Sequence, residues 1–202
     1  MLFMIKKQDD QQHHGNLKEA LVLAGMQLLR EEGLQALTLR RCAALAGVSH
    51  AAPAHHFDGL KGLKTAIATR GYAIFEQMMN DGIATAGPDK REQAIGVCHG
   101  YIGFATEHNA LFNLIFDSPD KFIQDAEWAK AGARARQVLN DTSSKLVDGP
   151  SGPATTEVLL FALAHGFAKL IEIGRVAPGS GDGRDVKFED VIAMVDLKGK
   201  PE

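Results

Sequence analysis

Cysteine and strand-forming patterns are scarce in this sequence of 202 residues. The two cysteines, Cys42 and Cys98, lie far apart and belong to no metal-binding spacing, so they indicate a reducing compartment rather than a disulfide framework. β-Branched residues are sparse and no stretch alternates polar and apolar residues, which argues against a sheet. Uninterrupted apolar runs stay shorter than the roughly 18 residues of a membrane span. An apolar start followed by Lys6 and Lys7 is the wrong order for a secretory signal, so we expect a cytoplasmic protein without a membrane partner.

Sequence motifs of enzymes are missing as well. The sequence contains no HExxH and no GxSxG, and Gly62 is followed by Leu where a phosphate-binding loop requires Lys. The adjacent pairs His13-His14 and His55-His56 would point in different directions on a helix and make poor metal ligands. We therefore predict no enzymatic activity, no cofactor and no metal.

An excess of positive charge is also lacking, since 22 Lys+Arg stand against 25 Asp+Glu for a net charge of -3. Taken alone, this balance disfavours a nucleic-acid binder, because phosphate contacts need Lys and Arg. The charge is unevenly distributed, however. Residues 1–70 hold nine basic and six acidic residues and five of the eight histidines, whereas residues 71–202 carry a net charge of -6. A modestly basic N-terminal part is therefore followed by an acidic remainder.

Helical patterning is abundant along the whole chain. Asn16 and Glu19 have the spacing of a capping box, which predicts a helix start there and leaves residues 1–15 as a mobile arm. Pro88 is suited to the first turn of a helix, and Ser118-Pro119 to the opening of another. We predict an all-α fold of about nine helices, over residues 17–33, 38–47, 49–57, 59–86, 88–107, 109–116, 118–147, 154–176 and 187–197.

Two short helices joined by a glycine-centred turn are predicted near the N-terminus. Small residues from Ala43 to Gly47 allow close helix crossing, Val48 is an apolar plug for the turn, and Ser49 can cap the second helix. This is the helix-turn-helix arrangement, in which the second helix enters a DNA groove. Ordinary helical bundles also contain short helices with glycine turns, so the spacing alone leaves that alternative open.

The residues of this segment closely resemble the DNA-binding domain of the tetracycline-repressor (TetR) family. The resemblance rests on Thr38–Ser49 (TLRRCAALAGVS), His55–Phe57 and Gly62-Leu63. Farther along, residues 101–112 resemble the Tyr-x-x-Phe-Ala and Leu-Phe pattern of one TetR subgroup. Residues 161–166 resemble the Trp-x-x-x-His-Gly motif of that subgroup, with Phe in place of Trp.

The resemblance implies a DNA-binding domain over residues 16–62 and a domain for effector binding and dimerisation over residues 63–202. It further implies a ligand-responsive repressor that binds a palindromic operator in double-stranded DNA as a homodimer and is released by a small, mostly apolar effector. The interface is expected on the apolar helix over residues 154–176 and on the last helix. The alternative is an all-α small-molecule carrier or interaction protein with a vestigial helix-turn-helix. Ala54 and Leu60 favour this alternative, because the family usually has Tyr and Lys there.

The predicted DNA contacts lie on the two short helices and just after them. The second helix has no Arg or Lys, so base readout depends on alanine contacts with thymine methyl groups and on hydrogen bonds from Ser49, His50 or His55. Phosphate contacts are expected from Thr38 and from the basic residues, whereas His56 has a structural alternative in packing beside Phe57. The predicted set is Thr38, Arg40, Arg41, Ser49, His50, Ala51, Ala52, Ala54, His55, His56, Lys61 and Lys64.

The histidines of this surface predict pH-dependent DNA binding. Histidine side chains gain positive charge near neutral pH, and each gained charge strengthens the attraction to phosphate. We therefore expect tighter operator binding at pH 6 than at pH 8, measured by fluorescence anisotropy. The variant with both His50→Gln and His55→Gln should lose this difference, and an unchanged pH dependence in it contradicts the idea.

The C-terminal part holds most of the chain's 13 aromatic residues. Such a set is more often plain core than a pocket. Gly96, Gly100 and Gly103 lie within one predicted helix, each at a cost of about 1 kcal/mol relative to Ala, and so indicate close helix crossing or room for a ligand. Histidines can orient a mostly apolar ligand. The predicted ligand-binding residues are Tyr101, Phe104, His108, Phe112, Phe116, Trp128, Phe161 and His165.

Overall fold

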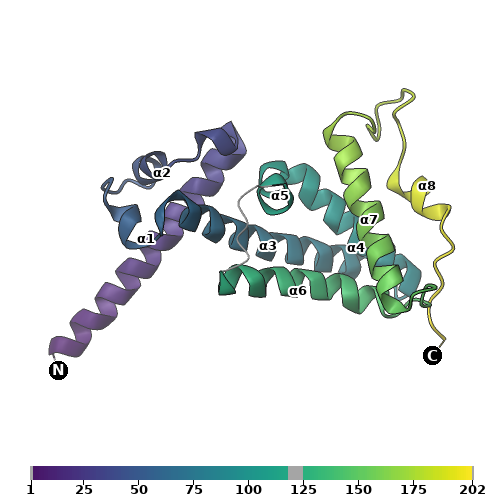
Figure 1. Cartoon of the computed structure of the whole chain (residues 1–202), viewed down its shortest axis with the longest axis horizontal. Coiled ribbons are helices and arrows are strands. Elements are labelled where there is room, and N and C mark those ends of the chain that lie inside the picture. Colours follow the sequence, from purple (N-terminus) through teal and green to yellow (C-terminus); the bar gives the residue numbers. More distant parts are fainter. Residues whose placement is uncertain (1, 118–124, 202) are drawn as a thin grey trace. The chain divides into compact units, whose positions relative to one another are not determined.

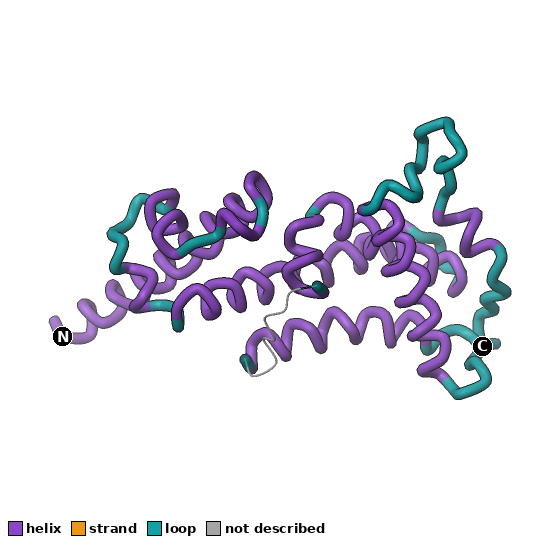
Figure 2. Tube along the Cα trace, turned by 45° about the horizontal axis from the view of Figure 1, so that its top comes forward, coloured by secondary structure: helices purple, strands orange, loops and turns teal. Residues whose placement is uncertain are grey.

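The computed structural model describes residues 2–117 and 125–201, with side chains described from Leu17 onward. Within these ranges the helices are joined by loops and no strand is formed (Figure 2), which confirms the all-α prediction. The α-helices are α1 (Leu2–Glu32), α2 (Leu39–Leu45), α3 (Gly59–Thr85), α4 (Lys90–Glu107), α5 (Asn109–Phe116), α6 (Ala126–Ser143), α7 (Pro153–Glu172) and α8 (Phe188–Ala193). Two short 3₁₀ helices, η1 (Leu34–Ala36) and η2 (Ala52–His55), complete the order.

The chain forms two compact units. The first comprises Met1–Gly71 with Ala110–Ala129, and the second comprises Tyr72–Asn109 with Lys130–Glu202. Helix α3 therefore contributes its first half to one unit and its second half to the other. The predicted division after residue 62 separates DNA binding from effector binding and dimerisation, and it stays a prediction.

In the first unit, α1 packs against η1 and α2 (Figure 1). Leu21, Leu28 and Leu29 on α1 are buried, as the helical spacing of apolar residues predicts. Gly33, with a φ of 80°, follows the last residue of α1 and confirms the predicted stop. The predicted start is wrong, because α1 begins at Leu2 rather than near Asn16. Residues 2–15 contain no proline and a single glycine, so nothing in the local backbone prevents the helix from extending there.

In the second unit, α4 packs against α7 (Figure 1) and approaches α3 very closely. A Cβ atom on Gly100 would overlap the carbonyl oxygen of Met78, and one on Gly96 would overlap that of Gly82. Gly103 is different, because its nearest neighbour is the flexible tip of the Met78 side chain at 3.3 Å. Close helix crossing therefore accounts for Gly96 and Gly100.

Local capping explains where α4 and α6 begin. The Asp89 side chain accepts hydrogen bonds from the N–H groups of Arg91 and Glu92, so α4 begins at Lys90 and Pro88 precedes the cap instead of lying in the first turn. The Asp125 side chain accepts a hydrogen bond of 2.8 Å from the Trp128 N–H in the first turn of α6. The predicted opening at residues 118 and 119 lies outside the described residues.

Helix α7 has one buried face and one exposed face. Leu160, Ala164 and Phe167 are buried, whereas Val158 and Ile173 are 63% and 66% exposed. Among the described residues, α7 is the one helix long and apolar enough to cross a membrane by length and composition, which the uninterrupted apolar runs did not predict. Core helices of globular proteins meet the same criterion, and α7 packs on α4. Within one chain, α7 is therefore buried on one side and exposed on the other.

Candidate functional site

Helix α2 is defined at both ends by the residues that the sequence singled out. The Thr38 hydroxyl oxygen accepts a hydrogen bond of 3.2 Å from the Arg41 N–H, which caps the first turn. At the other end Gly47 has a φ of 69°, and the N–H groups of Gly47 and Val48 donate to the carbonyl oxygens of Ala44 and Ala43. This pair of hydrogen bonds closes the helix in a Schellman motif. The predicted start and stop of the first short helix are confirmed.

The second short helix differs from the prediction. A helix capped by Ser49 and reaching Phe57 was expected, whereas the structure has only the 3₁₀ helix η2, without a side-chain cap. Proline has no N–H to donate and its ring disfavours the α conformation of the preceding residue, so Pro53 prevents a regular α-helix from starting at Ser49. The segment instead uses tighter hydrogen bonds, from Ala54 N–H to the Ala51 carbonyl and from His56 N–H to the Pro53 carbonyl.

Most predicted DNA contacts are exposed on the first unit. Ala52 is the exception, because it is buried and cannot offer its methyl group to thymine in this conformation. Two others, His56 and Lys64, are partly buried. The exposed residues of the predicted set are Thr38, Arg40, Arg41, Ser49, His50, Ala51, Ala54, His55 and Lys61.

Phe57 fixes the end of this segment in the first unit. Its ring is buried, with the Lys18 ammonium 5.9 Å from the ring centroid and the His56 ring 6.5 Å away at an edge-on angle. A cation over an aromatic face is an attractive contact. The packing of His56 beside Phe57 agrees with the structural alternative for His56, and Lys18 was not predicted to take part.

Arg41 forms an ion pair that the sequence did not predict. Its two terminal nitrogens donate to both carboxylate oxygens of Glu32, at 2.9 Å and 2.5 Å. The Arg41 guanidinium holds the pKa of Glu32 below its usual value, and the Glu32 carboxylate raises the pKa of Arg41. Glu32 and Arg41 are nine positions apart on different helices, so no helical periodicity could have revealed this pair.

The predicted ligand-binding residues divide between the two units. In the second unit, the Tyr101 hydroxyl and Nδ1 of His165 are hydrogen-bonded at 2.9 Å, and the Phe161 ring stacks on the His165 ring with centroids 5.5 Å apart. Tyr101 also meets Phe161 edge-on at 5.7 Å. We call Tyr101, Phe161 and His165 the aromatic–histidine cluster. Tyr101 is fully buried, whereas Phe161 is partly exposed.

The other members of the predicted ligand set are described by their own surroundings. Phe104 is fully buried against Phe75 at 5.0 Å, and the His108 ring lies 5.7 Å from Phe104. Phe112 and Phe116 belong to the first unit, where their rings are 5.0 Å apart, and Trp128 belongs to that unit too. The described contacts thus favour core packing for Phe104.

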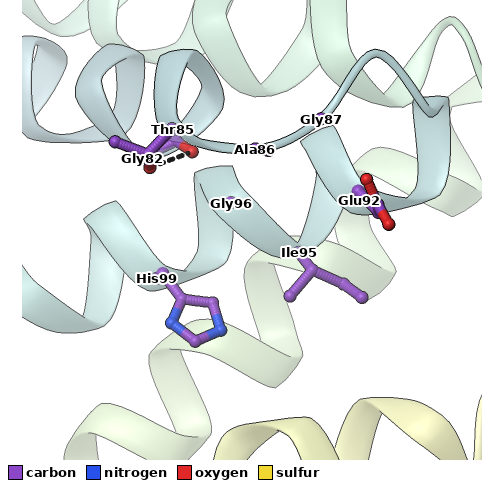
Figure 3. Close-up of a pocket in the computed structure, with 8 residues that line it drawn as sticks. All are labelled: Gly82, Thr85, Ala86, Gly87, Glu92, Ile95, Gly96 and His99. Carbon is purple, nitrogen blue, oxygen red and sulfur yellow. Dashed lines mark hydrogen bonds between the residues drawn. The ribbon is translucent and has the colours of Figure 1, made fainter.

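A hollow of about 290 Å³ opens beside the close crossing of α3 and α4 (Figure 3). His99, one of its lining residues, lies with Nε2 3.2 Å from a carboxylate oxygen of Glu189 on α8. None of the predicted ligand-binding residues belongs to this hollow. The residues that line it are Gly82, Thr85, Ala86, Gly87, Glu92, Ile95, Gly96 and His99.

The described residues contain two buried cysteines and no group of side chains suited to binding a metal ion. Burial raises the pKa of Cys98 to about 12, and it also raises the pKa of Cys42. Both thiols therefore stay protonated near neutral pH. No group of three His, Cys, Asp or Glu side chains among the described residues is placed to hold a metal ion.

In the described residues, an all-α fold carries near its N-terminus a capped helix, a glycine turn and an exposed second segment, which is the arrangement of a helix-turn-helix protein. Residues 94–195, just over half of the chain, match the family model of the tetracyclin repressor-like C-terminal domain. The chain therefore belongs to this TetR family of transcription regulators. No curated protein matches the sequence.

Solved structures share the fold over most of their length. A Rhodococcus sp. RHA1 protein of unknown function is 24% identical, with a TM-score of 0.72 over 88% of this chain and 90% of its own. A TetR family transcription regulator from Marinobacter aquaeolei VT8 is 17% identical, with a TM-score of 0.62 over 94% of this chain and 100% of its own. AibR, solved with isovaleryl coenzyme A and operator DNA, is 16% identical, with a TM-score of 0.61 over 89% of this chain and 97% of its own. At these identities the similarity concerns the fold.

Proposed function

We propose that this chain is a ligand-responsive repressor that binds a palindromic operator as a homodimer and is released by a small, mostly apolar effector. The observation that carries the proposal is the exposed helix-turn-helix surface, from the capped turn at Thr38 to Lys61, in a chain with a TetR-like C-terminal domain. We propose no catalytic role, and we expect the protein in the cytoplasm. The finer subgroup with a Trp-x-x-x-His-Gly-like motif is part of the proposal.

DNA contact in this proposal divides into phosphate binding and a sparse base readout. The Thr38 hydroxyl, Arg40 and Lys61 are exposed and bind phosphate, because side chains of these types donate hydrogen bonds to phosphate oxygens. Ser49, His50, Ala51 and His55 face the base edges, and Ala51 and Ala54 offer methyl groups to thymine. Without an arginine fork to guanine, each copy binds with modest affinity.

A second copy of the chain supplies the rest of the affinity. Val158 and Phe161 are exposed on α7, Ile173 is exposed directly after it, and Met194 after α8 is 89% exposed. Exposed apolar side chains gathered along one helix are typical of a subunit interface. In a two-fold dimer each half reads one half-site, and adjacent half-sites are about 34 Å apart on B-DNA.

The effector in this proposal binds at the aromatic–histidine cluster. Phe161 offers partly exposed apolar ring surface, and the His165 ring, hydrogen-bonded to the Tyr101 hydroxyl, is a polar group that can orient one polar end of a ligand. Phe161 and His165 lie on α7, the helix that carries the proposed interface. A ligand that fits better in one arrangement of α7 shifts the population of dimers away from the DNA-binding spacing.

The proposal is tested by fluorescence anisotropy with DNA from upstream of the chain's own gene, titrated over a range of salt. A repressor binds one sequence selectively, and log K falls steeply with log[salt]. Lys61→Ala should flatten that slope by about 0.9 per bound protomer, while the matched loss of charge in Lys130→Ala on α6 should leave it unchanged. Weak binding without sequence preference contradicts the proposal and favours the small-molecule carrier, whose best support is the short 3₁₀ segment without Arg or Lys.

A further inference from the structure

Arg41, one of the basic residues of the proposed DNA surface, is already engaged in an ion pair. Both terminal nitrogens of Arg41 bind Glu32, the last residue of α1, while Arg41 itself lies in the first turn of α2. Both side chains are more than two-fifths exposed, at 43% and 46%. The neighbouring Arg40 is exposed and makes no ion pair with any described side chain. The guanidinium group of Arg40 is therefore available to bind phosphate, whereas both terminal nitrogens of Arg41 already bind a carboxylate.

A carboxylate and a phosphate present the same pair of oxygens to a guanidinium group. Arginine binds both in a planar, two-pronged geometry, so a carboxylate that holds both prongs competes directly with a phosphate. Glu32 also carries its own negative charge, which repels a DNA strand passing over the Thr38 end of α2. Residues 1–70 hold nine basic and six acidic residues, so removing the charge of Glu32 would raise their surplus of basic residues from three to four.

We propose that Glu32 is an internal substitute for DNA phosphate, which masks Arg41 and thereby lowers the operator affinity and the salt dependence of this protein. This inference rests on the proposed function as a DNA-binding repressor. Its ligand is the phosphodiester backbone of the operator, and its effect is independent of base sequence. Glu32 sets how many phosphates each protomer neutralises.

The test compares Glu32→Gln with Glu31→Gln in the full-length protein. Both variants remove one negative charge from the end of α1, but Glu31 lies 3.6 Å from Arg30 and makes no contact with Arg41. We expect Glu32→Gln to bind the operator more tightly at 50 mM salt and to steepen the slope of log K against log[salt] by about 0.9 per bound protomer. That slope corresponds to a roughly 3.5-fold larger loss of affinity per protomer between 50 and 200 mM salt. Glu31→Gln should change neither quantity appreciably.

The Arg41→Gln background shows whether Glu32 acts through Arg41. The double variant with Arg41→Gln and Glu32→Gln should have the same slope of log K against log[salt] as the single variant Arg41→Gln. Equal effects of Glu31→Gln and Glu32→Gln, an unchanged slope in Glu32→Gln, or weaker binding by Glu32→Gln would each overturn the inference. Weaker binding would show that Glu32 positions Arg41 instead of masking it.

The failure of this inference is distinguishable from the failure of the proposed function. If the unsubstituted protein shows no sequence-selective binding to its upstream DNA, the proposed function fails and the masking idea fails with it. If the unsubstituted protein binds selectively and Glu32→Gln behaves like it, only the masking by Glu32 is wrong. Thermal unfolding followed by circular dichroism checks that all variants are folded at the assay temperature.

Discussion

Gly100→Ala should lower the free energy of unfolding by about 3 kcal/mol or more, an overpacking cost at the upper end of the usual range. The added Cβ atom would overlap the carbonyl oxygen of Met78 and lie 2.6 Å from Cα of Met79. Both neighbours are backbone atoms of α3, so no change of side-chain rotamer relieves the overlap. The two helices would have to move apart, which opens gaps in a closely packed interior. Urea unfolding followed by circular dichroism at 222 nm measures the loss.

Gly103→Ala is the matched control, because it adds the same methyl group to the same helix. Its nearest neighbours are the tip of Met78 at 3.3 Å and a carboxylate oxygen of Glu107 at 3.8 Å, and both side chains can move. Alanine is a better helix former than glycine by about 1 kcal/mol, so Gly103→Ala should be neutral or stabilising. If the two variants lose equal stability, the close crossing of α3 and α4 is not what requires Gly100.

The fold could be predicted from the sequence wherever a helix is bounded by its own residues. Thr38 and Gly47 delimit α2 through a side-chain cap and a left-handed backbone, and both features act within one turn of the helix end. Gly33 stops α1 for the same reason. These interactions are local, so residue type and spacing are enough to predict them.

Prediction failed where a local signal has more than one outcome. The Asn16 and Glu19 spacing of a capping box also occurs inside a longer helix, and α1 continues through it. Ser49 is a good N-cap, but Pro53 lacks an N–H group and its ring constrains the residue before it, and the result is η2 instead of an α-helix. Ala52, the first residue of η2, is buried.

The candidate sites were harder to predict than the fold, because they depend on contacts between residues far apart in the sequence. The Glu32–Arg41 pair joins two helices, and its members look like ordinary surface charges in the sequence. The aromatic residues of the C-terminal part form one group by composition, yet Phe112 belongs to the first unit and Tyr101 to the second. The Tyr101–His165 hydrogen bond spans 64 positions, and only the packing of α4 on α7 brings its two groups together.

A variant with both Val158→Glu and Ile173→Glu should be monomeric and should lose at least about 100-fold in operator affinity. Val158 on α7 and Ile173 directly after it are both exposed, so the folded subunit accommodates the charges, whereas a two-fold interface would bring four carboxylates into an apolar contact. In the proposed dimer, operator binding depends on this contact because the second half-site is bound at a high effective concentration. Light scattering after size-exclusion chromatography and fluorescence anisotropy measure the two effects.

Val147→Glu provides the control, since Val147 is 50% exposed in the loop before α7 and lies outside the proposed interface. It should remain dimeric and bind the operator like the unsubstituted protein. A doubly substituted protein that stays dimeric would place the interface elsewhere. A monomer that keeps full affinity would instead mean that one copy suffices for DNA binding.

The exposed residues of the second helix-turn-helix segment argue against binding by one copy. Ser49, His50 and His55 provide no arginine fork, and Arg41 is engaged by Glu32. With so few strong contacts in each copy, we expect selective binding to require two copies held at a fixed spacing through the proposed interface on α7.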